Sequence, residues 1–512
     1  MFSKTFGSAV HGVDARTITI EVNVTQGLDF YMSGLPDSAV KESQHRVESS
    51  LKSLDYFMPR NKVVVNLAPA DIRKEGSAYD LPIALSILQA SGQLKIQNLE
   101  SYMIMGELSL DGLLRPIRGV LPIAIQSRRE GFKGFILPAQ NAAEAAIVNN
   151  LEIIGVKSLS EAIDFFTGQI VIEPLQVDTR EIFQREINQH DTDFKDVQGQ
   201  ENIKRAMEIA AAGGHNVIMI GPPGAGKTML AKRLGTILPP LTLNEALETT
   251  KIHSVAGRLL NHASLMTTRP FRSPHHTISD VALVGGGGNP QPGEISLAHN
   301  GVLFLDELPE FKRTVLEVMR QPMEERRVTI SRAKVSIDFP ANFMLVASMN
   351  PCPCGFYNHP EKECVCGPGV VQRYLSKVSG PLLDRIDLHM EVVPVTFDEM
   401  IARRKSESSS DIRLRVVEAR KLQSERFKNF PDIYCNAMMP AQMVKEICTI
   451  QESGITMLRT AMERLGLSAR AYDRILKVSR TIADLSGAKN IETTHLAEAI
   501  NYRSLDREGW AG

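Results

Sequence analysis

The sequence predicts an α/β protein with three parts: an α/β domain, a second α/β domain built on a parallel sheet, and a helical region. Three short apolar runs in the middle of the chain predict buried strands: Val217–Ile220, Val302–Leu305 and Phe343–Ala347. Helix-like segments separate these runs, which indicates a mostly parallel sheet covered by helices on both faces. At 512 residues the chain is long enough for several cores, since single cores stop growing well below this length.

Composition is that of a folded globular protein, with 43% hydrophobic and 23% charged residues, which argues against wholesale disorder. The 58 Lys and Arg residues against 59 Asp and Glu leave a net charge of −1, so any surface for nucleic acid must be local. No apolar run is long enough to cross a membrane, and the segment Met1–Arg16 lacks the apolar core and cleavage site of a secretory signal. We therefore expect no membrane partner and a cytoplasmic location.

Strand-like and helix-like segments alternate over residues 1–168, which predicts the first α/β domain. Residues 169–192 are polar and poorly periodic, so we expect a linker there. The second α/β domain is predicted over 193–403, followed by a connector over 404–435. Its first part, 404–412, is polar, and the remainder of the chain is expected to be helical. A helical lid is expected over 436–512, where one apolar stripe consists of Ile475, Val478, Ile482 and Leu485.

A glycine-rich turn follows the first buried strand and precedes a helix-like segment. Its sequence, Gly-Pro-Pro-Gly-Ala-Gly-Lys-Thr, fits the pattern GxxxxGK[ST]. In such a turn the backbone N–H groups surround phosphates, the lysine contacts the β- and γ-phosphates, and the hydroxyl binds Mg²⁺. A chance glycine-rich turn is the alternative, but it would not require the strand before it and the helix after it. The predicted ATP site consists of Gly221, Pro222, Pro223, Gly224, Ala225, Gly226, Lys227 and Thr228.

Two acids, Asp306 and Glu307, end the second buried strand. Ligand sites in open α/β sheets lie at the carboxyl ends of the strands. Asp306 is therefore predicted to hold Mg²⁺, directly or through water, and Glu307 to activate the attacking water. Acids after an apolar strand also occur by chance, but about 75 residues after a phosphate-binding turn the functional interpretation is favoured.

Four cysteines form two closely spaced pairs in one short polar stretch: Cys352, Cys354, Cys364 and Cys366. Two tight pairs of thiolates suit a tetrahedral Zn²⁺ ion, and a shell of four cysteines leaves no open position for catalysis. The CxC spacing is tighter than the usual CxxC, so free thiols remain the alternative. Small apolar side chains would not cluster in a polar loop, so a structural zinc site is favoured.

By its motifs the central region resembles one AAA+ branch, that of magnesium chelatase motor subunits and minichromosome-maintenance helicases. The resemblance implies that Asn350, after the third strand, is a sensor 1 residue near the γ-phosphate; a turn-forming Asn before a proline is the alternative. Pro381-Leu-Leu-Asp-Arg-Ile-Asp387 is similar to the segment with the arginine finger, which implies that Arg385 completes a neighbouring subunit's site. Arg470 would be sensor 2. For both arginines a surface salt bridge is the alternative.

Two insertions strengthen this resemblance. Residues 269–293, with Arg-Ser-Pro-His-His at 272–276, resemble the helix-2 insert of the branch, a loop that faces the pore of the ring. Residues 327–338 are two alternating strands around Arg332-Ala-Lys334, similar to the pre-sensor-1 hairpin. Arg332 and Lys334 at the tip are predicted to contact DNA phosphates, with a solvated turn as the alternative.

The whole chain resembles the ComM or YifB family of magnesium chelatase-like proteins, on the motifs at 34–40, 272–276, 293–301 and 350–355. The resemblance implies a homo-hexameric ATPase that moves single-stranded and branched DNA in homologous recombination during natural transformation, alongside other recombination proteins. The fold expected from it is a P-loop AAA+ core with a helical lid, preceded by a Lon-protease-like (ribosomal S5 domain 2-like) domain. Its cofactors would be ATP, Mg²⁺ and a structural Zn²⁺.

The first domain resembles the Lon protease domain through Arg73-Lys-Glu-Gly-Ser-Ala-Tyr-Asp-Leu81. The slot of the nucleophile falls at Ala78, one place from Ser77, and the slot of the base falls near Leu121, with no lysine before Lys133. A Ser–Lys dyad needs both partners within hydrogen-bond reach, so we expect a non-proteolytic domain. A magnesium chelatase-type remodelling ATPase, an ATP-dependent protease and a nucleotide-gated scaffold remain as alternative functions.

Overall fold

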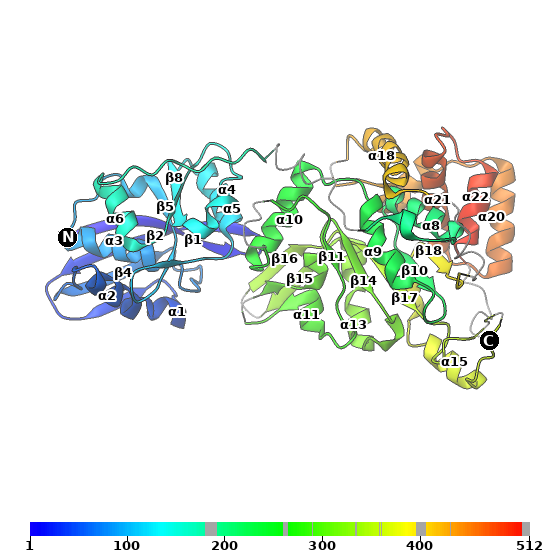
Figure 1. Ribbon diagram of the computed structural model, residues 1–512, viewed down its shortest axis with the longest axis horizontal. Coiled ribbons are helices and arrows are strands. Elements are labelled where there is room, and N and C mark those ends of the chain that lie inside the picture. Colours follow the sequence, from blue (N-terminus) through cyan, green and yellow to red (C-terminus); the bar gives the residue numbers. More distant parts are fainter. Residues whose placement is uncertain are drawn as a thin grey trace.

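The computed structural model describes residues 1–179, 192–259, 265–288, 290–332, 335–357, 359, 361–395, 406–430 and 432–503. The molecule is elongated, with the N-terminal domain at one end, the second α/β domain in the middle and the C-terminal helices at the other end (Figure 1). Among the residues described, no helix combines the length and the apolar character that crossing a bilayer requires.

The N-terminal domain has a seven-stranded mixed sheet in the order β3-β4-β2-β1-β5-β8-β9. Its long antiparallel strands alternate buried and exposed side chains, as expected of a sheet with one wet face. The strands are β1 (Phe2–His11), β2 (Asp14–Thr25), β3 (Phe30–Ser33), β4 (Lys62–Ala68), β5 (Tyr102–Ile104), β8 (Gly134–Pro138) and β9 (Glu152–Val156). The main helices are α2 (Ser43–Ser53), α3 (Asp80–Ala90), α4 (Val120–Arg129) and α6 (Leu159–Thr167).

The middle domain has a five-stranded parallel sheet in the order β11-β14-β17-β10-β18. Every residue of the three central strands is buried, so the apolar runs of the sequence are core strands as predicted. Because the strands are parallel, the ends of these three strands meet at one edge of the sheet. The bounds are β10 (Val217–Ile220), β11 (Phe271–Arg272), β14 (Val302–Leu305), β17 (Met344–Met349) and β18 (Leu388–Glu391).

The C-terminal region is helical and packs on the middle domain. The helices are α18 (Ser409–Arg426), α19 (Ala441–Ile447), α20 (Glu452–Leu465), α21 (Ala469–Leu485) and α22 (Thr493–Asn501). Helix α18 contacts α8 (Glu201–Gly213) and α9 (Lys227–Ile237) in the middle domain. It lies within the connector, 404–435, and most of its 18 residues follow the polar stretch 404–412, after which a helical remainder is expected.

A buried ion pair fastens α21 to the sheet. Arg474 of α21 pairs with Asp387, which is 2% exposed and lies just before β18. Burial alone would raise the pKa of Asp387, but Arg474 and His215 outweigh it and hold this pKa well below its usual range. The contact lies at the amino edge of the sheet, opposite the edge where β10, β14 and β17 end.

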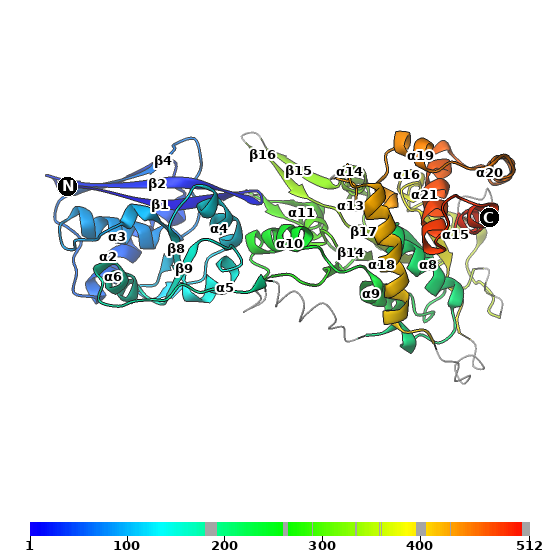
Figure 2. The ribbon, with the colours of Figure 1, turned by 90° about the horizontal axis from the view of Figure 1, so that it is seen from above.

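The N-terminal domain meets the middle domain along α10 (Leu243–Val255), a contact visible from two directions (Figures 1 and 2). The hydroxyl of Ser254 in α10 donates to Glu144 at 2.5 Å, and Lys251 pairs with Asp14 at 3.5 Å. On its other side, α10 contacts α12 (Glu294–Leu297) in the middle domain. Helix α10 therefore links the two domains.

Candidate nucleotide site and four-cysteine cluster

The glycine-rich turn links β10 to α9 at the carboxyl edge of the sheet. Gly224 and Gly226 have φ values of 81° and 86°, in the left-handed region that favours glycine. Gly221 lies so close to the neighbouring chain segment that an added Cβ would stand 2.2 Å from the carbonyl oxygen of Val392. The turn therefore has the backbone of a phosphate-binding loop, with the N-terminus of α9 at its end.

Lys227 and Asn350 are brought together, as their placement after β10 and β17 predicted. The Lys227 ammonium donates to the Gly221 carbonyl at 2.7 Å, the Pro222 carbonyl at 2.9 Å and the Asn350 Oδ1 at 3.1 Å. Burial lowers the pKa of Lys227, and Asp306 and Glu307 oppose that shift. A phosphate in the turn would offer this cation a charged partner in place of neutral carbonyls.

Asp306 accepts two side-chain hydrogen bonds. The Thr228 hydroxyl donates to one carboxylate oxygen at 2.8 Å, and the Ser348 hydroxyl donates to the other. A hydroxyl and a carboxylate side by side are the oxygen ligands that Mg²⁺ uses in P-loop proteins. Ser348 was missed by sequence reasoning, although a serine inside the otherwise apolar strand β17 was a visible signal.

Glu307 lies next to Asp306 with a left-handed backbone, φ 54°. Its carboxylate is 56% exposed and stands 3.5 Å from Nδ1 of His276, in the predicted helix-2 insert. His276 is a second residue that sequence reasoning left without a role at this site. A pocket of about 400 Å³ is lined by Glu307 together with Pro223, Gly224, Ala225, Gly226, Lys227, Thr228, Met229, Asp306, Met349 and Asn350.

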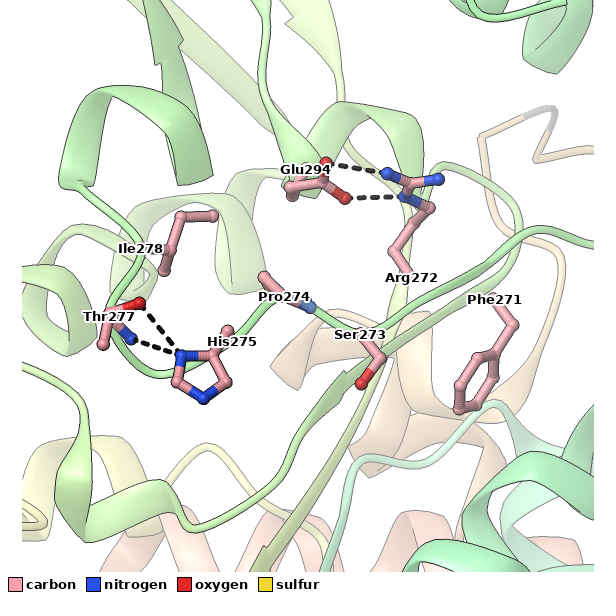
Figure 3. A pocket seen from close by; sticks show the side chains of 8 residues that line it. All are labelled: Phe271, Arg272, Ser273, Pro274, His275, Thr277, Ile278 and Glu294. Carbon is pink, nitrogen blue, oxygen red and sulfur yellow. Dashed lines mark hydrogen bonds and ion pairs between the residues drawn. The ribbon is translucent and has the colours of Figure 1, made fainter.

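The predicted helix-2 insert forms a second pocket, of about 470 Å³ (Figure 3). Arg272 at the end of β11 forms a two-pronged ion pair with Glu294, at 2.6 and 2.7 Å. His275 Nδ1 stands 2.9 Å from the Thr277 hydroxyl, and the ring of His275 lies 4.1 Å from that of His276. This segment therefore has a defined shape beside Glu307.

Arg385 and Arg470 are not among the residues that line the nucleotide pocket. Arg385 is 5% exposed and pairs with Glu324 at 2.5 Å, while its carbonyl accepts from the Asn216 side chain at 3.1 Å. Asn216 precedes β10 and the phosphate-binding turn follows it, so Arg385 lies at the opposite edge of the sheet. Arg470 is exposed in the first turn of α21, four residues before Arg474.

The four cysteines converge as predicted. All four Sγ atoms lie within 4.8 Å of one another, and the Sγ atom of Cys352 stands 3.3 Å from that of Cys354 and 3.7 Å from that of Cys364. Zn–S bonds of about 2.3 Å in a tetrahedron would separate the sulfurs by about 3.8 Å. The donor set therefore fits a Zn²⁺ ion.

The predicted DNA hairpin is present as β15 (Arg327–Arg332) and β16 (Val335–Pro340). The strands are antiparallel, and the last described pair of the ladder is Arg332 with Val335. Lys334 and the side chain of Arg332 lie outside what the structure describes, so it does not test their predicted contacts.

In the N-terminal domain, Ser77 and Lys133 have separate partners. The Ser77 hydroxyl donates to Glu107, and Lys133 pairs with Glu152 at 3.5 Å. Leu121, at the slot of the base, is fully buried in α4. These contacts are not those of a Ser–Lys dyad.

Glu307→Gln is expected to stop ATP turnover while ATP stays bound, because only water activation is lost. Lys227→Ala is expected to weaken ATP binding itself by at least about tenfold, since the phosphate loses a charged hydrogen bond. Nucleotide binding and phosphate release measured side by side separate the two effects. Turnover at the wild-type rate in Glu307→Gln would contradict the assignment of the base.

Three family models match the chain. The model described as magnesium chelatase, subunit ChlI, covers residues 193–400, the model described as its C-terminal part covers 406–503, and the model described as subunit ChlI of Mg-chelatase covers 20–141. The C-terminal match begins before α18, so it assigns that helix to the C-terminal domain. A shorter stretch is 33% identical over 157 residues to Lon protease 2 of Bacillus subtilis, which covers 28% of this chain and 27% of that protein.

Relatives match over nearly the full length. The competence protein ComM of Haemophilus influenzae is 44% identical over 508 residues, covering 98% of this chain and 97% of that protein. The YifB protein of Salmonella typhimurium is 44% identical over 506 residues, covering 98% of this chain and 96% of that protein. Both the middle and the flanking domains take part in these matches, and the chain therefore belongs to the ComM/YifB family of magnesium chelatase-like AAA+ proteins.

Proposed function

We propose that this protein is an ATP-driven hexameric motor that translocates on DNA and promotes branch migration and unwinding in homologous recombination during natural transformation. The observation that supports an ATPase most directly is the hydrogen-bonded set at the carboxyl edge of the sheet: Lys227, Thr228, Asp306, Ser348 and Asn350. The 44% identity to a competence protein over nearly the whole chain supports the proposed action on DNA during natural transformation. The site of action would be the cytoplasm.

In this proposal the side chains divide the work of phosphoryl transfer. Thr228 and Asp306 would hold Mg²⁺, which would supply positive charge beside the phosphates. Lys227 exchanges its carbonyl contacts for phosphate oxygens, and Asn350 positions the attacking water beside the γ-phosphate. Glu307 takes the proton from that water, once its carboxylate leaves His276, 3.5 Å away.

DNA would be held in the pore by the β15–β16 hairpin. The strands of the hairpin are antiparallel, and the sequence puts Arg332 and Lys334 where they end, a position from which side chains can project away from a sheet. Six subunits would bring about twelve cations to one channel, although the net charge of each chain is −1. Phosphate contacts of this type are tolerant of sequence and sensitive to salt.

Arg385 would complete the site of a neighbouring subunit. It lies at the sheet edge opposite its own phosphate-binding turn, tied to Asn216, so it has no route to its own nucleotide. Release from Glu324, which is 52% exposed, would free its guanidinium for the neighbour. Arg470, exposed at the start of α21, is proposed to contact nucleotide as sensor 2.

Remodelling of a partner protein, as in a magnesium chelatase, is the second candidate, favoured by the family-model matches over 193–400 and 406–503. DNA-dependence of the ATPase discriminates between the two. A motor should hydrolyse ATP several-fold faster with single-stranded or branched DNA, and equal rates with and without DNA would favour the remodelling ATPase.

Arg332→Ala combined with Lys334→Ala is expected to leave hexamers and basal ATPase near normal. DNA affinity should fall, and the plot of log affinity against log salt concentration should flatten by about one unit for each phosphate contact that the hexamer loses. Arg327→Ala, at the base of the same hairpin and 58% exposed, is the matched control. Unchanged DNA binding in the double variant would show that the DNA site lies outside the tip of the hairpin.

Arg385→Ala is expected to lower ATPase although its own phosphate-binding turn is intact. Mixing Arg385→Ala with Lys227→Ala subunits should restore part of the rate, because some interfaces then contain one intact turn and one intact arginine. The measurement is ATPase against mixing ratio at constant total protein. Absence of rescue at every ratio would rule out action across the interface.

The four cysteines are proposed to hold one structural Zn²⁺ per chain. Cys352→Ser with Cys364→Ser should lose the metal and lower the melting temperature, as removal of a structural zinc shell does. Cys448→Ser, a buried cysteine outside the cluster, is the control and should retain zinc. If elemental analysis finds no zinc in purified wild-type protein, the proposal of a zinc site is wrong.

A further inference from the structure

The four-cysteine loop touches the phosphate-binding turn through a glycine. Gly355 is buried and has φ 84°, and a Cβ added to it would stand 2.4 Å from Cδ of Pro223 and 2.9 Å from Cγ. Only a glycine backbone therefore lies this close to Pro223 without a clash. The loop and the turn are in direct contact, although they lie far apart in the sequence.

The cysteines determine where Gly355 lies. Its N–H donates to the carbonyl of Cys352 at 3.0 Å, and it follows Cys354 directly in the chain. The N–H of Tyr357 donates to the Cys352 sulfur at 3.3 Å. A metal ion that links these sulfurs to Cys364 would close the loop and hold Gly355 against Pro223.

The same segment reaches the nucleotide pocket from other sides. Asn350, two residues before Cys352, accepts from Lys227 at 3.1 Å. After the cysteines comes α15 (Pro368–Leu375), and Lys377, two residues beyond it, pairs with Glu310 at 3.3 Å. The loop is thus fastened beside Asn350 and just beyond Glu307.

The Lys227 ammonium holds the Gly221 and Pro222 carbonyls, but the glycines in the later part of the phosphate-binding turn make few side-chain contacts. Gly224 has no atom within 4 Å of a Cβ position, and Gly226 has one neighbour, Cε of Met229 at 3.4 Å, an ordinary van der Waals contact. A glycine backbone without side-chain contacts loses much entropy on ordering. Pro223 gives the turn a rigid ring, and Gly355 supplies a surface for that ring to pack on.

We propose that the metal-bound four-cysteine loop positions the phosphate-binding turn through the contact between Gly355 and Pro223, so that occupancy of the cysteine site sets the affinity for nucleotide. The inference rests on the proposed nucleotide and zinc sites. Gly355 is a positioning residue, because it acts on the nucleotide through Pro223. The four-cysteine site has a role in the motor and does more than stabilise its own loop.

The test is a double-variant cycle on the full chain. Gly355→Ala should keep about one zinc per chain but weaken binding of a fluorescent ATP analogue by about tenfold or more, as overpacking of a tight contact does. Pro223→Ala removes the atoms that the new methyl group would meet. The double variant Gly355→Ala, Pro223→Ala should therefore bind the ATP analogue more tightly than the summed losses of the two single variants predict.

Two glycines serve as matched controls. Gly487 has φ 68° and no atom within 4 Å of a Cβ position, so Gly487→Ala has the same backbone strain without the contact. Gly369→Ala, also without such neighbours, lies in α15 beyond the cysteines. Both variants should bind nucleotide like wild type.

Removal of the metal by a chelator completes the design. It should weaken nucleotide binding in wild-type protein and change it little further in Gly355→Ala, since the contact is already lost. A folded, zinc-loaded Gly355→Ala with wild-type nucleotide affinity would overturn the inference, as would equal effects of chelation in both proteins. If wild-type protein contained no zinc, the proposed zinc site would be refuted. If wild-type protein bound no nucleotide, the proposed ATPase function would be refuted.

Discussion

The parallel alignment of β10, β14 and β17 is the constraint on which the rest of the molecule depends. Because the three buried strands run in one direction, the residues that follow them meet at one edge. There Lys227 donates to Asn350, and Asp306 accepts from Thr228. The opposite edge receives Arg385, Asp387 and helix α21. The candidate nucleotide site therefore lies at one edge of the sheet. Arg385, which is proposed to act on a neighbouring subunit, lies at the other edge.

Much of this edge could be predicted from the sequence, because each part is local. A buried strand, a glycine-rich turn and a helix follow one another without interruption, and Asp306 directly follows its strand. The four cysteines all fall between Cys352 and Cys366, so their convergence was also predictable. The seven-stranded order of the first domain, by contrast, depends on pairings across the chain, such as β1 with β5.

What the sequence could not reveal is contact between distant segments. The sequence around His276 does not indicate that this residue stands beside Glu307. The sequence around Gly355 does not indicate that this glycine contacts Pro223. The bounds of helix α18 could not be predicted because its apolar residues form no strong stripe; the helix is held by contacts to α8, α9 and α21. The motif around Arg385 does not specify where this residue lies. Its position at the edge of the sheet opposite the phosphate-binding turn supports the proposal that it acts on a neighbouring subunit.

Displacement of a labelled strand from a branched DNA substrate, with ATP and Mg²⁺, tests the central claim most directly. We expect ATP-dependent displacement by wild-type protein that disappears in Glu307→Gln while DNA binding remains, because the motor then holds nucleotide without turning it over. Tight DNA binding with active ATP hydrolysis but no displacement would contradict a translocating motor.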